Sequence, residues 1–321
     1  MLLEIPISRN DAGQRTDRFL RKYFPKMGLA RLHSLFRRKE IKIAKKSVTR
    51  SRVLETGEII QVYGLKPEEG LLFRDGIEAP RAARPMPPII FEDDELLVVN
   101  KPAGMAAHPG TGIAPGDSLI ERVLAYLAPR REEWGQELFS PSLAHRLDKE
   151  TSGVVLIAKT GERLRSLMEA FRNGRVRKKY LTLVEGCPEP EEGLIDAPLA
   201  REDNAAGAKS RVVETGGKNA RTRYRVLKKS ESGSLLQVII ETGRMHQIRS
   251  HLAHIGHSVV GDTRYGRPSE VRNRMRALGL KRLFLHAEEA AFPESKGLRT
   301  FHAPLPPELD SVLKKLGLNP A

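Results

Sequence analysis

One carboxylate set among cations is the clearest candidate for chemistry in this chain. Asp148 lies between Arg146 and Lys149, in the segment His-Arg-Leu-Asp-Lys-Glu-Thr-Ser-Gly that covers residues 145–153. Nearby positive charge favours the ionised form of a carboxyl group, and an ionised carboxylate held in a pocket is a candidate nucleophile. Taken alone, a bare Arg-Leu-Asp is more typical of a surface cluster of ion pairs.

The residues that follow this motif predict how Asp148 is positioned. A Thr-Ser-Gly turn leads into the apolar run 154–158, which is short and bounded by a turn signal, as buried strands are. We therefore expect Asp148 on a loop at the mouth of a sheet, where binding and catalytic residues are commonly built.

The pattern from residue 89 onward favours an α+β catalytic domain with a mixed, largely antiparallel sheet, flanking helices and a central cleft. Predicted strands often follow one another directly, with helices inserted between them, which argues against a doubly wound α/β fold. The expected strands are 89–92, 96–100, 154–158, 178–185, 223–227, 235–242 and 284–287. The expected helices are 118–128, 162–172, 244–255 and 307–316.

The charge of the chain points to a polyanionic partner. The 321 residues carry a net charge of +15 with a pI near 10.0, which is typical of proteins that bind nucleic acid, with an acidic membrane surface as the alternative. Residues 1–66 hold 16 Lys and Arg against 6 Asp and Glu, so most of the excess charge lies in a fifth of the chain. No apolar run is long enough for a membrane span, no signal peptide is evident, and the single Cys187 fits a reducing cytoplasm.

The basic N-terminal region has the pattern of a small RNA-binding module. Two amphipathic helices are expected at 12–24 and 29–39, followed by strand-like runs at 40–44 and 58–63. This order resembles the alpha-L RNA-binding module, although a solvated basic face is the alternative for a lone run of charge. The cations expected to contact RNA are Arg15, Arg18, Arg37, Arg38, Lys39, Lys42, Lys45, Lys46, Arg50 and Arg52.

Three segments are therefore expected along the chain. Residues 1–66 form the RNA-binding module, residues 67–88 are a linker rich in Gly and Pro, and residues 89–321 form the catalytic domain. The linker is not expected to fix one orientation of the module.

Five separated segments of the catalytic domain, taken in order, closely resemble the RluA-type family of RNA pseudouridine synthases. The resemblance extends over about residues 89–304 and favours the ribosomal large-subunit branch (RluC/RluD-like), many members of which carry an alpha-L module. The segments that carry it are 99–105, 145–153, 178–186, 217–222 and 241–252.

The resemblance implies a role for particular residues. Asp148 corresponds to the catalytic aspartate, Arg249 to the basic residue that pairs with it, and Tyr180 to an active-site tyrosine that packs on the base and helps move a proton. Arg146 corresponds to the arginine that enters the RNA stack as the target base leaves, and Ile248 to an apolar residue of the pocket wall. The implied reaction is site-specific isomerisation of uridine to pseudouridine in structured RNA, with large-subunit ribosomal RNA favoured as substrate.

Several expectations accompany this reading. The reaction oxidises nothing and adds no group, so neither a cofactor nor a metal is expected, and a monomer is the default state. Four histidines between 246 and 257 are expected to pack and to contact RNA, because a zinc site would need further ligands. The alternatives left open are a non-catalytic RNA-binding or ribosome-assembly factor and a synthase that acts on transfer RNA.

Overall fold

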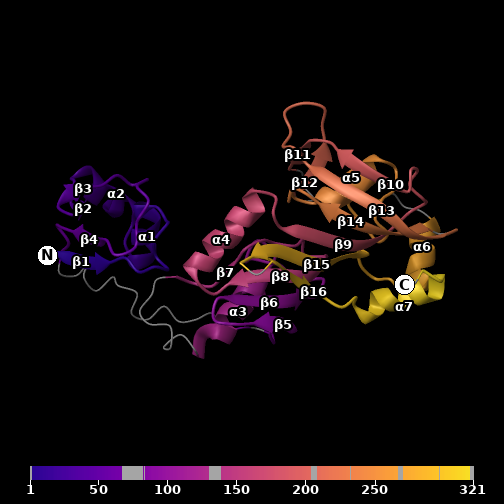
Figure 1. The fold of residues 1–321 in the computed structure, drawn as a ribbon, viewed down its shortest axis with the longest axis horizontal. Helices are drawn as coiled ribbons and strands as arrows, with labels where there is room; N and C mark the ends of the chain where they lie inside the picture. Colours follow the sequence, from indigo (N-terminus) through magenta and orange to yellow (C-terminus); the bar gives the residue numbers. More distant parts are fainter. Residues whose placement is uncertain are drawn as a thin grey trace.

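Two packed units follow one another along the chain (Figure 1). The structure, a computed structural model, describes residues 2–66, 82, 84–129, 139–203, 208–231, 233–266, 270–295 and 297–318. The predicted linker lies outside the described residues over 67–81 and at 83. Within the described ranges, no helix combines the length and apolar character needed to cross a membrane.

The N-terminal unit is a four-stranded sheet covered by two helices. Its elements are β1 (Leu3–Pro6), α1 (Thr16–Tyr23), α2 (Leu29–Arg37), β2 (Ile41–Ile43), β3 (Lys46–Ser47) and β4 (Ile59–Val62), with the strand order β1-β4-β2-β3. Phe19 and Leu20 of α1 and Leu35 of α2 are fully buried against the sheet. Both predicted helices are present but shorter, since α1 begins only at Thr16, whose hydroxyl donates to the Arg52 carbonyl.

The second unit is built on a ten-stranded sheet, which confirms the predicted α+β fold with a mixed, largely antiparallel sheet. The sheet order is β10-β13-β14-β9-β15-β8-β6-β5, with β16 paired to β15 and β7 paired to β8. Its strands are β5 (Ile89–Glu92), β6 (Leu96–Lys101), β7 (Ser142–Leu143), β8 (Ser152–Ala158), β9 (Arg177–Val184), β10 (Glu192–Asp196), β13 (Arg221–Ser230), β14 (Gly233–Ile240), β15 (Leu285–Glu294) and β16 (Gly297–His302).

Helices and one hairpin complete the second unit. The helices are α3 (Leu119–Leu127), α4 (Gly161–Arg172), α5 (Gln247–His254), α6 (Glu270–Ala277) and α7 (Pro307–Leu316), and the hairpin pairs β11 (Leu199–Glu202) with β12 (Lys209–Val212). The sequence pattern did not predict β1, β3, β7, β10, β11, β12, β16 or α6. The strand expected at 284–287 extends to Glu294, because pairing with β9 and β16 overrides the poor strand propensity of its Ala and Glu residues.

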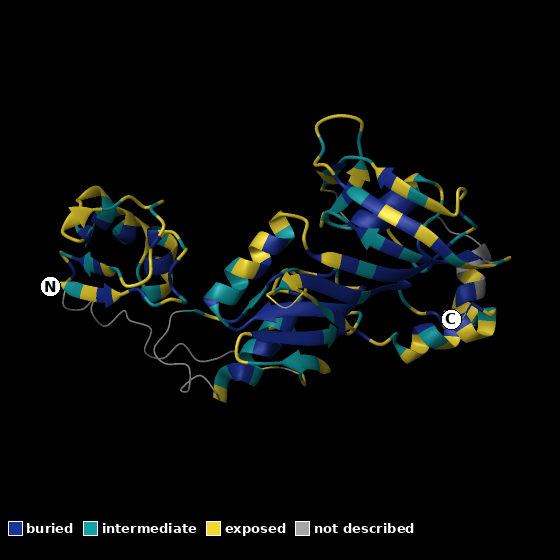
Figure 2. Cartoon of the chain, in the orientation of Figure 1, coloured by how far each residue is buried: buried dark blue, intermediate teal, exposed yellow. Residues whose placement is uncertain are grey.

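The centre of the sheet is covered on both faces, as the dark strands of Figure 2 show. All seven residues of β8 are buried, and they alternate between two hydrophobic clusters. Val155 and Ile157 pack in the cluster that includes α3, whereas Val154 and Leu156 pack in the cluster that includes α4. This double burial explains why β8 reads as a continuous apolar run.

A glycine sets how closely β8 approaches β15. These two strands form the parallel pair of the described sheet, through Ser152↔His286 and Gly153↔Ala287, while the other strand pairs are antiparallel. Gly153 has a φ of +125°, and a Cβ at this position would overlap the carbonyl oxygen of Ala287. The glycine of the Thr-Ser-Gly turn therefore permits the backbone contact that places the preceding loop beside the other half of the sheet.

The N-terminal unit contacts the first turns of α4. The Arg165 guanidinium donates to the Ala12 carbonyl at 2.6 Å and to the Arg9 carbonyl at 2.9 Å. The backbone N–H of Gly161 donates to the Asn10 side chain at 3.1 Å, and a Cβ at Gly161 would overlap the Asn10 carbonyl. The contact is thus polar, and it needs a residue without a side chain at the start of α4.

Candidate active site

Asp148 lies on the loop between β7 and β8, at the mouth of the sheet, as the sequence predicts. Two neighbours hold this loop. The carbonyl of Lys149 accepts hydrogen bonds from the Gly104 N–H at 2.8 Å and from the Lys101 ammonium at 3.2 Å. The Thr151 N–H donates to the carbonyl of Asp148 itself, which closes the turn. The loop is therefore attached to the turn that follows β6.

Lys101 is the fully buried cation that makes this attachment. Its ammonium also donates to the carbonyls of Pro102 at 3.0 Å and Met105 at 2.9 Å. Burial lowers the pKa of Lys101 to about 7, against the opposing influence of the Asp148 carboxylate. Three carbonyl oxygens match the three donors of an ammonium group. Lys101 therefore links the Asp148 loop to the turn that follows β6.

Arg249, on α5, bridges two carboxylates. Its Nε and Nη2 atoms donate to Asp262 at 2.7 and 2.9 Å, and its Nη1 atom lies 3.4 Å from Oδ2 of Asp148. Arg249 and Asp262 are both buried, whereas Asp148 is partly exposed. The arginine is thus held by the buried carboxylate and presents its remaining edge to the accessible one.

The electrostatics of the pair agree with this division. Burial lowers the pKa of Arg249, but the hydrogen bond to Asp262 together with the negative charges of Asp262 and Asp148 makes the net shift upward. Burial raises the pKa of Asp262, but the hydrogen bond and charge of Arg249, together with the backbone N–H groups of Arg264 and Tyr265, make the net shift downward. Both groups are therefore charged, and their mutual attraction offsets the cost of removing them from water.

A histidine and a tyrosine lie beside Arg249, near the same carboxylate oxygen of Asp148. Nε2 of His246 lies 3.7 Å from Oδ2 of Asp148, and Nδ1 of His246 lies 3.0 Å from the Tyr265 hydroxyl. The Tyr265 ring also lies under the Arg249 guanidinium, 5.1 Å from its centroid. Residues 246, 249, 262 and 265 thus converge on Asp148 from α5 and the loop that follows it.

Apolar residues form the remaining wall of the site. Tyr180 of β9 and Ile248 of α5 are buried in one cluster with Leu147 and Met105. Burial, followed by the Asp148 charge, raises the pKa of Tyr180, which keeps its hydroxyl protonated. The structure therefore brings together Asp148, Tyr180, Ile248 and Arg249, four of the residues that the sequence predicted.

The cations that flank Asp148 in the sequence differ from the groups that lie beside its carboxylate in the structure. Arg146 and Lys149 flank Asp148 in the sequence, but both are exposed, and the groups beside the carboxylate are instead the Arg249 guanidinium and the His246 ring. The side chains of sequence neighbours in an extended loop point in different directions. The sequence therefore indicated positive charge near Asp148, but the cation beside the carboxylate is Arg249. Arg146 remains accessible two residues before Asp148.

The predicted RNA-binding cations lie mostly on the surface of the N-terminal unit. Lys42 and Arg52 are half-buried; Lys42 lies over the Tyr63 ring, and Arg52 is ion-paired with Glu58. Arg52 is therefore committed to a contact inside the unit. The exposed ones are Arg15, Arg18, Arg37, Arg38, Lys39, Lys45, Lys46 and Arg50.

Sequence reasoning missed Lys101, Asp262 and Tyr265, and it expected His246 to pack and to contact RNA without a link to Asp148. One signal for Asp262 was present: the residue follows Val259-Val260-Gly261, where an acid after an apolar run needs a charged partner. His251, by contrast, is buried and hydrogen-bonded to Thr222 and Ala197, as expected of a packing histidine. Among the described residues, no group of three or more His, Cys, Asp or Glu is placed to hold a metal ion.

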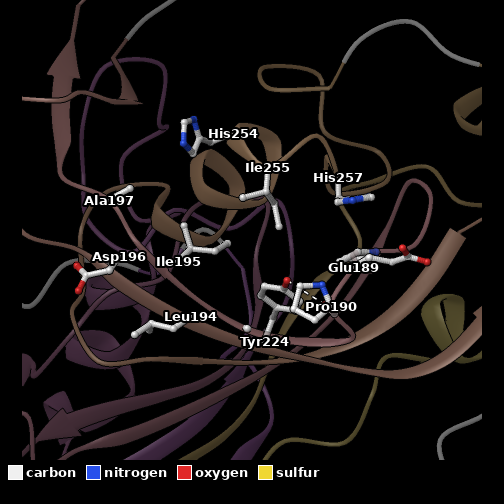
Figure 3. A pocket seen from close by; sticks show the side chains of 12 residues that line it. Glu189, Pro190, Leu194, Ile195, Asp196, Ala197, Tyr224, His254, Ile255 and His257 are labelled. Atoms are coloured by element: carbon white, nitrogen blue, oxygen red, sulfur yellow. Dashed lines mark hydrogen bonds between the residues drawn. The ribbon is translucent and has the colours of Figure 1, made fainter.

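A separate pocket of about 450 Å³ lies between β10, β13 and the end of α5 (Figure 3). Its wall includes Tyr224, whose hydroxyl donates to the Pro190 carbonyl, together with Asp196 and His254. None of the converging residues around Asp148 lines it, and its described lining contains no lysine or arginine. A phosphate-bearing substrate would find no cation there, so Asp148 marks the better candidate site.

Comparisons with known proteins identify relatives of this chain. Residues 95–254 match the family model described as RNA pseudouridylate synthase. The chain is 34% identical over 320 residues to the ribosomal large subunit pseudouridine synthase C of Vibrio cholerae, covering 97% of this chain and 96% of that protein. It is also 34% identical to the protein of the same name from Escherichia coli K12, with the same coverage.

A solved structure shows the same fold. Human RNA pseudouridylate synthase domain containing 4 superposes with a TM-score of 0.58 at 26% sequence identity. The match covers 72% of this chain and 93% of that one.

Proposed function

The chain belongs to the RNA pseudouridylate synthase family, in its RluA-type branch, and is an isomerase; we propose that it converts uridines of large-subunit ribosomal RNA to pseudouridine with Asp148 as the catalytic carboxylate. The observation that carries this proposal is Arg249, which joins Asp148 to the buried Asp262. The relatives named for the ribosomal large subunit, 34% identical over nearly the whole chain, support the choice of RNA.

The chemistry needs few protein groups. The bond from C1′ of the ribose to N1 of uracil breaks, the base turns, and a bond from C1′ to C5 forms. C5 then loses its proton and N1 gains one, so product and substrate are isomers and no oxidant, donor group or nucleotide is consumed. What the protein supplies is an anion near the sugar and a group that accepts the C5 proton.

Asp148 meets the first need. It is partly exposed at the loop, and the positive Arg249 guanidinium lies 3.4 Å from its carboxylate on the protein side. Because Arg249 is buried, the attraction acts through a medium of low dielectric and is little screened by salt.

Tyr180 is a protonated hydroxyl in an apolar environment, so it could meet the second need only as a relay that passes its own proton on as it receives the one from C5. Its raised pKa makes the phenol a weak acid, so it orients the base or passes a proton on rather than carrying a charge itself. Ile248 supplies an apolar surface beside it. Asp148 is the other candidate acceptor of the C5 proton.

Access to the uracil requires that the nucleotide leave its helix or loop. Extrusion costs a few kcal/mol, and a side chain that fills the gap offsets part of that cost. Arg146 is exposed, planar and two residues from Asp148, so we assign it this role. The exposed cations of the N-terminal unit would hold the flanking RNA through its phosphates.

The proposal also covers the oligomeric state, the need for a cofactor and the location in the cell. We propose a monomer that needs no cofactor and acts in the cytoplasm, where ribosomal RNA is assembled. The lack of a cofactor follows from the chemistry proposed above, and the cytoplasmic location follows from the proposed substrate.

The test is release of tritium from RNA labelled at uracil C5. Purified protein would be incubated with unmodified ribosomal RNA and, separately, with unmodified transfer RNA. Asp148→Asn removes the charge at constant shape, and Glu150→Gln, an exposed carboxylate of the same loop, is the matched control. We expect release from ribosomal RNA by the wild type and by Glu150→Gln, and none above background by Asp148→Asn.

Each other outcome corrects a particular part of the proposal. Release from transfer RNA alone would move the substrate to that class. Release by Asp148→Asn would remove Asp148 from its role. Tight RNA binding with no release from either RNA would favour the ribosome-assembly factor.

A further inference from the structure

His246 has an unusual backbone conformation at the start of α5. Its φ of 50° and ψ of 24° lie in the left-handed region, and its side chain does not cap the helix. Such a conformation costs a non-glycine residue on the order of 1 kcal/mol, and it persists only where surrounding contacts hold it. The ring it carries lies between Tyr265 and Asp148.

The hydrogen bonds of Tyr265 determine which nitrogen of His246 carries the proton. The Tyr265 hydroxyl accepts the backbone N–H of Ser210 at 2.7 Å, and Nδ1 of His246 lies 3.0 Å away. The hydroxyl has one proton to donate, and among the described residues Nδ1 of His246 is the acceptor with which it forms a hydrogen bond. With Nδ1 accepting, the proton of a neutral imidazole is on Nε2, the nitrogen that faces Asp148.

Burial of the His246 ring favours its neutral form. Burial lowers the pKa of His246, Asp148 and Asp262 oppose that shift, and Arg249 and Arg264 add to it. Tyr265 packs edge-on against the ring, with centroids 5.7 Å apart. A neutral ring has a single N–H, and here it is directed at the carboxylate.

We propose that His246 is a positioning residue, which presents an Nε2–H donor to Asp148 in a direction set by Tyr265. Oδ2 of Asp148 would then face two donors, Nη1 of Arg249 at 3.4 Å and Nε2 of His246 at 3.7 Å. These distances exceed those of strong hydrogen bonds, so the proposed positioning requires both to shorten when RNA binds. This inference rests on the proposed function, because it concerns the geometry of the proposed catalytic carboxylate.

The chain of donors runs in one direction. In the proposed arrangement the Ser210 N–H donates to the Tyr265 hydroxyl at 2.7 Å, that hydroxyl donates to Nδ1 of His246 at 3.0 Å, and Nε2 of His246 faces Oδ2 of Asp148 at 3.7 Å. Because each link orients the next, removing the middle link should release the last one. A purely structural histidine, which only begins a helix, would show no such dependence on the Tyr265 hydroxyl.

The first experiment reads the tautomer in the free protein. Nitrogen-15 NMR of ring-labelled histidine, assigned with a His246→Gln sample, should show the Nε2–H form. Tyr265→Phe keeps the ring that lies under Arg249 but removes the donor to Nδ1, so the Nε2–H form should lose its dominance. Tyr224→Phe makes the same chemical change at the other pocket and should leave the His246 signal in place.

The second experiment measures single-turnover rates and RNA affinity separately. We expect His246→Ala to lower the rate about tenfold at saturating RNA, with Kd within about twofold, as for a lost hydrogen bond to a charged group. His246→Gln should recover most of the rate because its amide offers an N–H. Tyr265→Phe should cost about threefold, and the double variant should lose no more than His246→Ala alone.

The outcomes are separable. An Nδ1–H tautomer in the wild type, a wild-type rate for His246→Ala, or losses that multiply to about thirtyfold in the double variant would overturn the inference. An inactive wild type would overturn the proposed function instead. In that case the NMR measurement, which needs no turnover, still decides whether His246 faces Asp148 as a donor.

Discussion

The N-terminal unit and the site around Asp148 use arginine in opposite ways. In the N-terminal unit Arg18, Arg37 and Arg38 are exposed on a small, separate fold. At the site Arg249 is 6% exposed and its guanidinium is divided between two carboxylates. Exposed cations act additively, since each exchanges counterions for a phosphate. A buried cation depends on its carboxylate partners, and removing one partner leaves a buried charge uncompensated.

The largest expected effect on stability is the loss of Asp262. Asp262→Asn leaves the Arg249 charge buried without its main partner, which should lower the free energy of unfolding by about 3–5 kcal/mol. Turnover should fall roughly 100-fold as Arg249 shifts from Asp148. Urea unfolding and tritium release measure the two effects.

A matched substitution in the N-terminal unit tests whether burial causes the expected cost of Asp262→Asn. Asp17→Asn removes the partner of Arg15 at the surface, where both side chains contact solvent, and should cost less than about 1 kcal/mol. If the two substitutions were equally costly, burial would not be what distinguishes the regions.

Acid stability is the next expected difference. Burial lowers the pKa of His286 to about 4, below the ordinary value of 6.5, so the unfolded state binds more protons between these values. The stability held by neutral His286 is therefore complete above pH 6.5 and is lost as the pH falls, by about 3 kcal/mol at pH 4.

Unfolding at pH 7 and at pH 4 checks this prediction. His286 bridges Ser152 on β8 and Ala303 after β16, so His286→Gln should reduce stability at pH 7 and flatten its decline toward acid. His33→Gln, an exposed histidine of the N-terminal unit, is the matched control and should keep the wild-type decline. An unchanged decline in His286→Gln would assign the acid sensitivity to other groups.

Smaller effects are expected from the exposed cations. Arg18→Gln combined with Arg37→Gln keeps the helices but removes two charges, which should weaken RNA binding about tenfold at low salt. The slope of log affinity against log salt should fall by about 2, while turnover at saturating RNA stays at the wild-type value. A lower saturated turnover would show that these cations do more than hold phosphate.

The smallest expected effect is at the contact between the two units. Arg165→Gln removes a charged donor from the carbonyls of Ala12 and Arg9 and should cost about 1 kcal/mol or less. RNA affinity should change by no more than about threefold. A tenfold loss would mean that a fixed orientation of the N-terminal unit, rather than its charge, supplies the affinity.

The sequence predicted the parts of the site that depend on local pattern. The loop position of Asp148 follows from a turn signal before a buried strand, and β8 and α4 follow from their periodicity. It did not predict Asp262 as the partner of Arg249, because that contact depends on how α5 and the next loop pack together. It also missed β10, an edge strand with three exposed residues, because its stability comes from pairing with β13.

The turn after Asp148 also bears on how relatives of this chain should be compared. Gly153 is required by the distance between two backbones, and any side chain there would meet Ala287. A descendant that abandons catalysis but keeps the fold remains under the same steric constraint at Gly153, while Asp148 is free to drift. A relative that retains the glycine has therefore kept the inherited fold, whereas a relative that retains the aspartate is still under selection for the reaction.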